Sequence, residues 1–298
     1  MISKILWTTD DSEDSLAALK YAELLAKNCK ADICGLTVLS EDYSFLAGLP
    51  SDEKSTIKNR IQKDLELIAL RRFEKLSKEI RENGLNFSYE IVEGIVAKEI
   101  IKAAETENAD IIAMGKGRSS DKFILGETAL KVLRNCTIPI LTARQNGIKT
   151  DIKKILVPIA LSHGITANLD YALRLSKIFN SKIYLANIVE TSDHNFQTEL
   201  LEKIKSHTKR DLGYLLGKLN IDENIEIHVG AAKNAWIGIT ELAKENDIDL
   251  IVMMNYGGTV HKKEFLGSIA WRVIQASPIP VITLTPSKII MKMTGDTK

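Results

Sequence analysis

The residues with the clearest chemical potential lie in the segment MMNYGGTVHKKEFLGSIAWRVI, residues 253–274. Gly257 is followed by nine residues and then by Gly267 and Ser268, which open a stretch of helical periodicity. Glycines let the backbone approach a ligand closely, the free amides of a helix N-terminus favour an anion, and a serine hydroxyl adds a donor. These residue types at this spacing favour a phosphate-binding loop, although ordinary turns also use spaced glycines.

The first half of the chain carries a counterpart, GKGRSSDKFILGE, which begins at Gly115 and contains Gly117 and Gly126. This loop is two residues shorter, and Glu127 stands where the second half has Ser268. A carboxylate in the first turn of a helix interacts favourably with the helix dipole, but it would compete with a phosphate for the same place. The second half therefore has the better phosphate end.

The remaining polar residues give little support to metal binding or covalent catalysis. The histidines have no ligand spacing such as His-x-x-x-His, and no acid or oxyanion-hole signature accompanies Ser162-His163. The cysteines form no Cys-x-x-Cys pair, and their sparse, odd number is typical of buried thiols in a reducing compartment. We predict neither metal ligands nor catalytic residues among these side chains: His163, His194, His207, His228, His261, Cys29, Cys34 and Cys136.

The overall composition is that of a globular protein, with 298 residues, 45% hydrophobic and 27% charged. A formal charge of +1 provides no basic excess, so we expect no nucleic-acid partner. No apolar run approaches the roughly 20 residues that a membrane helix needs. Acidic residues follow the N-terminus too soon for a signal peptide, and we expect a cytoplasmic protein without a membrane anchor.

The elements that must position the glycine loops occur twice. LGETALKVLRNCTIPIL, from Leu125, returns as LGSIAWRVIQASPIPVI, from Leu266, and apolar strands alternate with amphipathic helices through both halves. This alternation predicts an α/β fold in which helices cover both faces of a parallel sheet. We assign residues 1–146 and 151–286 to two tandem doubly wound domains and residues 287–298 to a tail.

The longest predicted helix runs from about residue 55 to residue 83, where Asn83-Gly84 ends it. Its apolar residues recur at helical spacing and predict one buried face. The residues of that predicted face are Ile57, Ile61, Leu65, Ile68, Leu76 and Ile80. Ahead of the first helix, Ser12 is the predicted N-cap.

The sequence combines this order of elements with ILVP at 155–158, ADIIAMG at 109–115 and the two Gly…Ile-Pro stretches. Together these features resemble the universal stress protein family over nearly the whole chain. Nucleotide-binding members of that family carry Gly-x-x-Gly, nine residues, then Gly-Ser or Gly-Thr, and an aspartate after the first strand. The resemblance implies a five-stranded parallel sheet in each domain. It also implies that the two domains pair through their last strands, IPILTA and IPVITL.

Neither half keeps the whole binding pattern of that family. The second half has Met254 in place of the first glycine and Ala160 in place of the aspartate, and the first half has the shortened loop. The resemblance implies that the nucleotide-binding positions are Asp10, Val38, Gly115, Gly117, Gly126, Gly257, Gly267 and Ser268.

The resemblance also implies a function, namely a stress-response protein that binds adenine nucleotide, ATP with Mg²⁺, and contacts protein partners. The second half is favoured as the half that binds nucleotide, because its glycine loop keeps the family's spacing. Two alternatives stay open: an interaction module that holds another small ligand, and a slow ATPase, for which no base or nucleophile stands out. The sequence does not identify the partners, and a homodimer stays open.

Overall fold

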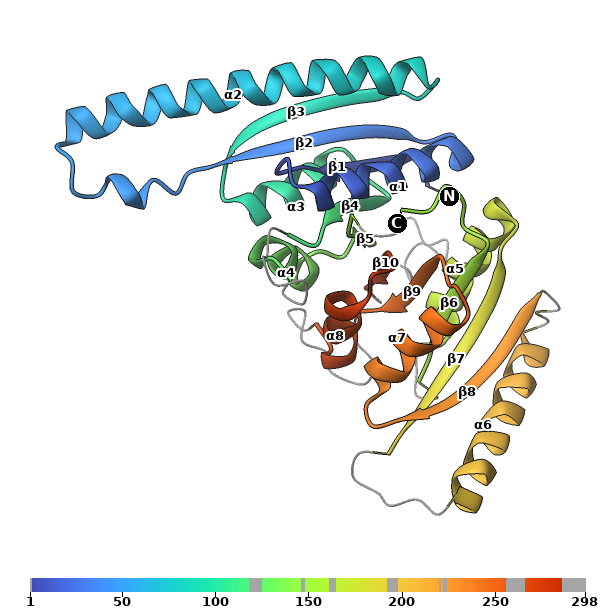
Figure 1. Ribbon diagram of the computed structural model, residues 1–298. Coiled ribbons are helices and arrows are strands. Elements are labelled where there is room, and N and C mark those ends of the chain that lie inside the picture. The colour runs from blue at the N-terminus through green and yellow to red at the C-terminus, as the bar shows by residue number, and fades with distance from the viewer. Residues whose placement is uncertain are drawn as a thin grey trace, which may run out of the picture.

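The computed structural model describes residues 2–117, 125–145, 148–160, 165–191, 198–219, 221, 224–255 and 266–285, and strands alternate with helices through both halves (Figure 1). The first half contains β1 (Lys4–Thr8), α1 (Glu13–Cys29), β2 (Asp32–Ser40), the 3₁₀ turn η1 (Ser44–Leu46), α2 (Ser51–Glu82), β3 (Phe87–Gly94), α3 (Val96–Thr106), β4 (Ile111–Gly115), α4 (Glu127–Asn135) and β5 (Ile140–Ala143). The second half contains β6 (Lys154–Pro158), α5 (Ile165–Phe179), β7 (Lys182–Glu190), α6 (Thr198–Lys218), β8 (Ile225–Ala232), α7 (Ala235–Glu245), β9 (Leu250–Met254), α8 (Ser268–Ala276) and β10 (Val281–Leu284).

All these strands form one sheet, in the order β3-β2-β1-β4-β5-β10-β9-β6-β7-β8. Neighbouring strands are parallel within each half, and β5 and β10 are antiparallel, with Leu141 opposite Ile282. The predicted α/β fold and the predicted pairing of the two halves through their last strands are confirmed. Because the halves run in opposite directions, the carboxyl ends of their strands lie at opposite edges of the shared sheet.

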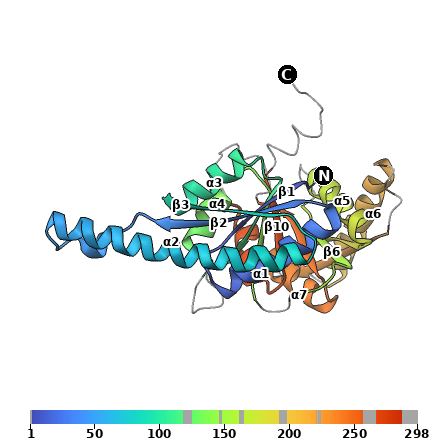
Figure 2. The same cartoon turned by 90° about the horizontal axis from the view of Figure 1, so that it is seen from above.

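Helices cover both faces of the sheet, as predicted (Figure 2). One core lies under α1, α2, α5 and α6 and includes Trp7 and Leu212, and the other lies under α3, α4, α7 and α8 and includes Leu6 and Val273. Each core contains residues from both halves. Leu6 and Trp7 enter different cores because successive side chains of a strand point to opposite faces.

The predicted N-cap of the first helix is confirmed, since the Ser12 Oγ accepts a hydrogen bond from the Ser15 N–H at 3.2 Å. No helix in the described ranges is long and apolar enough to cross a membrane. In the same ranges, no group of three or more His, Cys, Asp or Glu side chains is arranged to hold a metal ion.

The predicted buried face of α2 is wrong for its N-terminal half. Ile57, Leu65 and Ile68 are exposed, whereas Phe73 and Ile80 are buried. The helix has 32 residues and spans roughly 48 Å, while the nine residues of β2 span about 30 Å. The helix therefore extends beyond the sheet that its C-terminal half covers (Figure 1).

Candidate functional site

The glycine loops leave the sheet through the same hydrogen-bonded stem in both halves. In the first half, the Gly126 N–H donates to the Lys116 carbonyl at 2.7 Å. In the second half, the Gly267 N–H donates to the Asn255 carbonyl at 2.7 Å. Each stem places the start of a helix, α4 or α8, beside the carboxyl end of the preceding strand. Gly257 lies outside the described residues.

The glycines of the first half make room for the chain itself. A Cβ on Gly115 would lie 2.6 Å from the Ser15 backbone nitrogen, at the start of α1. A Cβ on Gly117 would lie 2.7 Å from the Gly126 Cα, and the φ of Gly117 is +106°, which side chains disfavour. The spacing of these glycines is therefore explained by contacts between backbone segments.

Both helix starts have a glycine N-cap without a side-chain hydrogen bond, at Gly126 for α4 and at Gly267 for α8. The first-turn amides of such helices have no capping side chain, and they favour an anion. The two starts differ in charge. The exposed Glu127 carboxylate in the first turn of α4 pairs with Lys131 at 2.6 Å, which lowers the pKa of Glu127, so this group is negative at neutral pH. The first turn of α8 has no acidic residue, and its Ser268 is exposed.

Asp10 lies at the carboxyl end of β1, where it shapes the turn into α1. Its Oδ1 accepts hydrogen bonds from the Ser12 N–H at 3.1 Å and from the Ser12 Oγ at 2.5 Å. The following residue, Asp11, has a φ of 65° and forms an ion pair with Arg72. Asp10 itself is exposed, and so is Ala160 after β6 in the second half.

Val38 lies on β2 close to the end of β1. The Thr9 N–H donates to the Leu36 carbonyl at 2.9 Å, so residues 9 and 10 lie beside the end of β2. Val38 is half-buried and packs against the core under α3 and α4. The structure therefore brings Asp10, Val38 and Gly115 to one edge of the sheet. Gly267 and Ser268 lie at the opposite edge, so the predicted residues divide between two sites.

Lys116 has a role that its sequence context does not reveal. The side chain is fully buried, and its Nζ donates to the Ser277 carbonyl of the second half at 2.7 Å. Burial and, to a smaller extent, the charge of Arg144 lower the pKa of Lys116 to about 7, and Asp14 opposes the shift. One feature of the sequence marks this position. Lys116 directly follows β4, whereas the equivalent residue after β9 in the second half is Asn255.

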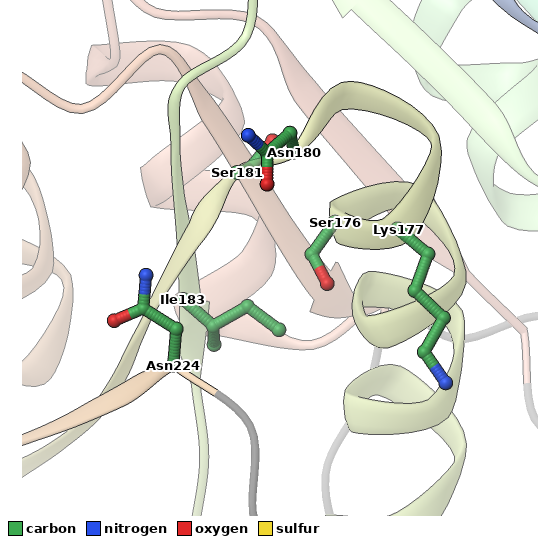
Figure 3. A pocket seen from close by; sticks show the side chains of 6 residues that line it. All are labelled: Ser176, Lys177, Asn180, Ser181, Ile183 and Asn224. Carbon is green, nitrogen blue, oxygen red and sulfur yellow. The ribbon is translucent and has the colours of Figure 1, made fainter.

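A hollow of about 210 Å³ lies beside the C-terminal end of α5 (Figure 3). It lies at the amino ends of β7 and β8, whereas ligands of open α/β sheets bind beyond the carboxyl ends. The two serine hydroxyls that line it already donate to carbonyls, Ser176 to Leu173 at 2.9 Å and Ser181 to Ile152 at 2.5 Å. This hollow therefore has no free serine donor for a ligand.

Comparison with known proteins identifies the family. The model of the universal stress protein family matches residues 1–144 and again residues 151–284. The chain belongs to the universal stress protein family. Its two Usp domains share one sheet, and each domain carries one of the helix starts described above.

Individual relatives agree with this assignment. Two universal stress proteins of Methanocaldococcus jannaschii are each 31% identical to this chain, and each match covers 49% of it. The first match spans 147 residues and 84% of the relative, and the second spans 158 residues and 98% of the relative. A universal stress protein structure from Archaeoglobus fulgidus is 23% identical, has a TM-score of 0.69 and covers 95% of this chain and 96% of its own. A functionally unknown protein from Pseudomonas aeruginosa has a TM-score of 0.70 at 19% identity, with 98% and 95% covered. The two solved structures share the fold along the length of this chain.

Proposed function

We propose that this universal stress protein binds adenine nucleotide in its second domain, with the phosphates at the start of α8. One observation carries the proposal: of the two equivalent helix starts, the start of α8 combines a glycine cap, an exposed Ser268 and no carboxylate. At the start of α4, the ionised Glu127 would repel a phosphate. Family membership supports adenine nucleotide as the anion.

The nucleoside end of the proposed site differs from the family pattern because Ala160 replaces the aspartate. At the equivalent of Val38, the half-buried Ile188 of β7 offers an apolar contact. We therefore expect binding through the phosphates and the base, with a weak contribution from the ribose. Ser268 and the first amides of α8 would hold ATP with its Mg²⁺.

The opposite end of α8 provides a route from the nucleotide to the first domain. Ser277 follows the last turn of α8, and its carbonyl accepts the hydrogen bond from Lys116. A ligand at the N-terminus of this helix thus acts on an element that contacts both domains. This arrangement supports binding and conformational signalling, in the context of a stress response, over turnover.

Titration of the full chain with Mg-ATP in an isothermal calorimeter tests the proposal. We expect saturable binding that Ser268→Glu weakens by at least about tenfold, because a carboxylate then faces the phosphates. The matched exchange in the first domain, Glu127→Ser, should leave this affinity unchanged. Absence of saturable binding at millimolar ATP, or equal binding by Ser268→Glu, would contradict the proposal. A different copurified small molecule in native mass spectrometry would favour the alternative of another ligand.

A further inference from the structure

The first domain carries a projecting segment that has no counterpart among the described residues of the second domain. Residues 51–68, the N-terminal half of α2, are mostly exposed, and the first turns of the helix extend past the sheet (Figures 1 and 2). The equivalent helix α6 has 21 residues, compared with 32 in α2. The second domain therefore covers its strands with a helix that is 11 residues shorter. The extension is therefore not required to cover the strands.

An apolar stripe runs along the projecting half of α2 and consists of Ile57, Ile61, Leu65 and Ile68. Ile57, Leu65 and Ile68 are 37%, 43% and 55% exposed. At about 100° per residue, the four side chains fall within an arc of about 80°. A contiguous exposed apolar surface of this kind marks an interaction site.

The stripe does not face the chain's own sheet. The inward side of this half of α2 is polar: Lys58 pairs with Glu93 at the end of β3 at 3.2 Å, and Gln62 donates to the same carboxylate. Lys58 also lies over the ring of Tyr43, at 5.1 Å from its centroid. The stripe lies on the adjacent flank of the helix.

Charged residues border the stripe in a self-complementary order. Glu53, Arg60, Asp64 and Arg71 fall within an arc of about 40° on one side of the stripe. All four are exposed, and in the described part of the chain none of them forms an ion pair. Arg72 follows Ile68 in line with the stripe, and it is already paired with Asp11 of the same chain.

We propose that the stripe is a dimer interface that a second copy of this chain occupies, with the two α2 helices antiparallel about residues 62–63. In this register Ile57 faces the partner's Ile68, and Ile61 faces the partner's Leu65. A two-fold axis places the same flank of both helices together. Glu53 then meets the partner's Arg71, and Arg60 meets the partner's Asp64, each contact occurring twice.

The charge order selects the antiparallel arrangement and the second copy. In a parallel pair, the two-fold axis would place this charged flank against the opposite flank of the partner helix. That flank carries Lys58 and Gln62, which already contact Glu93 of their own chain, so the four charges would have no matching partners. The order acid, base, acid, base along the helix becomes complementary when it is reversed. A second copy supplies that reversed order together with a matching stripe.

Sedimentation velocity of the full chain over a range of concentrations tests the interface. We expect a reversible monomer–dimer equilibrium, and Leu65→Asp combined with Ile68→Asp should weaken it by at least about a hundredfold, because the interface would bury unpaired carboxylates. Leu200→Asp, at a leucine of α6 that is 50% exposed, is the matched control and should leave the equilibrium unchanged. Far-UV circular dichroism should show equal helix content in all variants.

A charge exchange tests the antiparallel register. Arg60→Glu alone should weaken the dimer by about tenfold, since each of the two ion pairs becomes a repulsion. Adding Asp64→Arg should restore the wild-type equilibrium, and Lys63→Glu, on another side of the helix, should have no effect. A monomer at every concentration, or a dimer that survives the stripe substitutions, would overturn the proposed interface. Failure of the double exchange to restore the dimer would overturn the antiparallel register.

Discussion

At the residue scale, the two domains use different side chains at equivalent positions to contact each other. Lys116 reaches the Ser277 carbonyl directly. The equivalent Asn255 donates to the Thr285 Oγ at 2.9 Å, and this hydroxyl donates to the Cys136 carbonyl at 3.2 Å. Cys136 and Ser277 follow α4 and α8, so both contacts join the end of a strand to the end of a helix in the other domain. The lysine contact differs because its donor can carry a full charge.

The buried amine should make stability depend on pH. The pKa of Lys116 is lowered from 10.5 to about 7 in the folded chain. Between these values the unfolded chain binds the extra proton, so the free energy of unfolding rises with pH, by about 1.4 kcal/mol per unit at most. Below pH 7 both states are protonated, and the cost of burying the charge is fully present. Lys116→Met removes this cost, and its stability advantage over the wild type should shrink as pH rises from 7 toward 10. Urea unfolding at several pH values measures this, with Lys75→Met as the exposed control; a pH-independent difference would contradict it.

The glycine at the stem of the first loop should resist substitution for a conformational reason. Gly117→Ala places a Cβ 2.7 Å from the Gly126 Cα, at a φ of +106°. We expect a loss of about 1–3 kcal/mol in the free energy of unfolding. In contrast, Gly217→Ala lies in α6 with open space around it and should stabilise by about 0.5–1 kcal/mol. Thermal unfolding of both variants checks the pair, and equal effects would contradict the assigned strain.

Part of the candidate site could be predicted from residue types alone. The alternation of strands and helices fixed the edge where Asp10 and Gly115 meet, because parallel strands end on one side of a sheet. The sequence alone could not show whether the glycines make room for a ligand or for another backbone segment, since both need a position without a side chain. The contact made by Lys116 could not be predicted, because its acceptor is 161 positions away in the sequence and belongs to the other domain.

At the element scale, α2 shows that hydrophobic periodicity predicts a helix but does not predict which of its apolar residues are buried. The recurrence of Ile57, Ile61, Leu65 and Ile68 predicted a helix with an apolar side, and that helix is confirmed. Periodicity does not state what covers the apolar side, because this depends on which side of the helix packs against the sheet. Phe73 packs against Tyr89 at a ring-centroid distance of 4.8 Å because β3 runs beneath it. Ile68 lies about 140° around the helix from Phe73, on a flank that β3 does not cover, and it remains exposed.

At the scale of the whole molecule, the seam between β5 and β10 joins two domains into one sheet. Thr142 and Thr283 are buried there, and each hydroxyl lies near a carbonyl of the other strand, at 3.4 Å from Val281 and 3.2 Å from Ile140. The seam strands contribute to cores that run through both domains on either face. Neither domain can lose its last strand without exposing the unpaired edge of the other. We therefore expect the two domains to unfold together.

Tryptophan fluorescence can test this coupling because the chain has three tryptophans, Trp7 in the first domain and Trp236 and Trp271 in the second. In a Trp236→Phe, Trp271→Phe background, fluorescence reports the first domain through the buried Trp7. Adding Ile274→Ala, which empties a fully buried position on α8, should destabilise by about 2–5 kcal/mol. Because the sheet is shared, the midpoint reported by Trp7 should fall by the same amount as the midpoint from far-UV circular dichroism. Leu200→Ala, at an exposed leucine of the second domain, should shift neither midpoint. A Trp7 transition that keeps its position while the dichroism signal moves would mean that the seam transmits no stability between the domains.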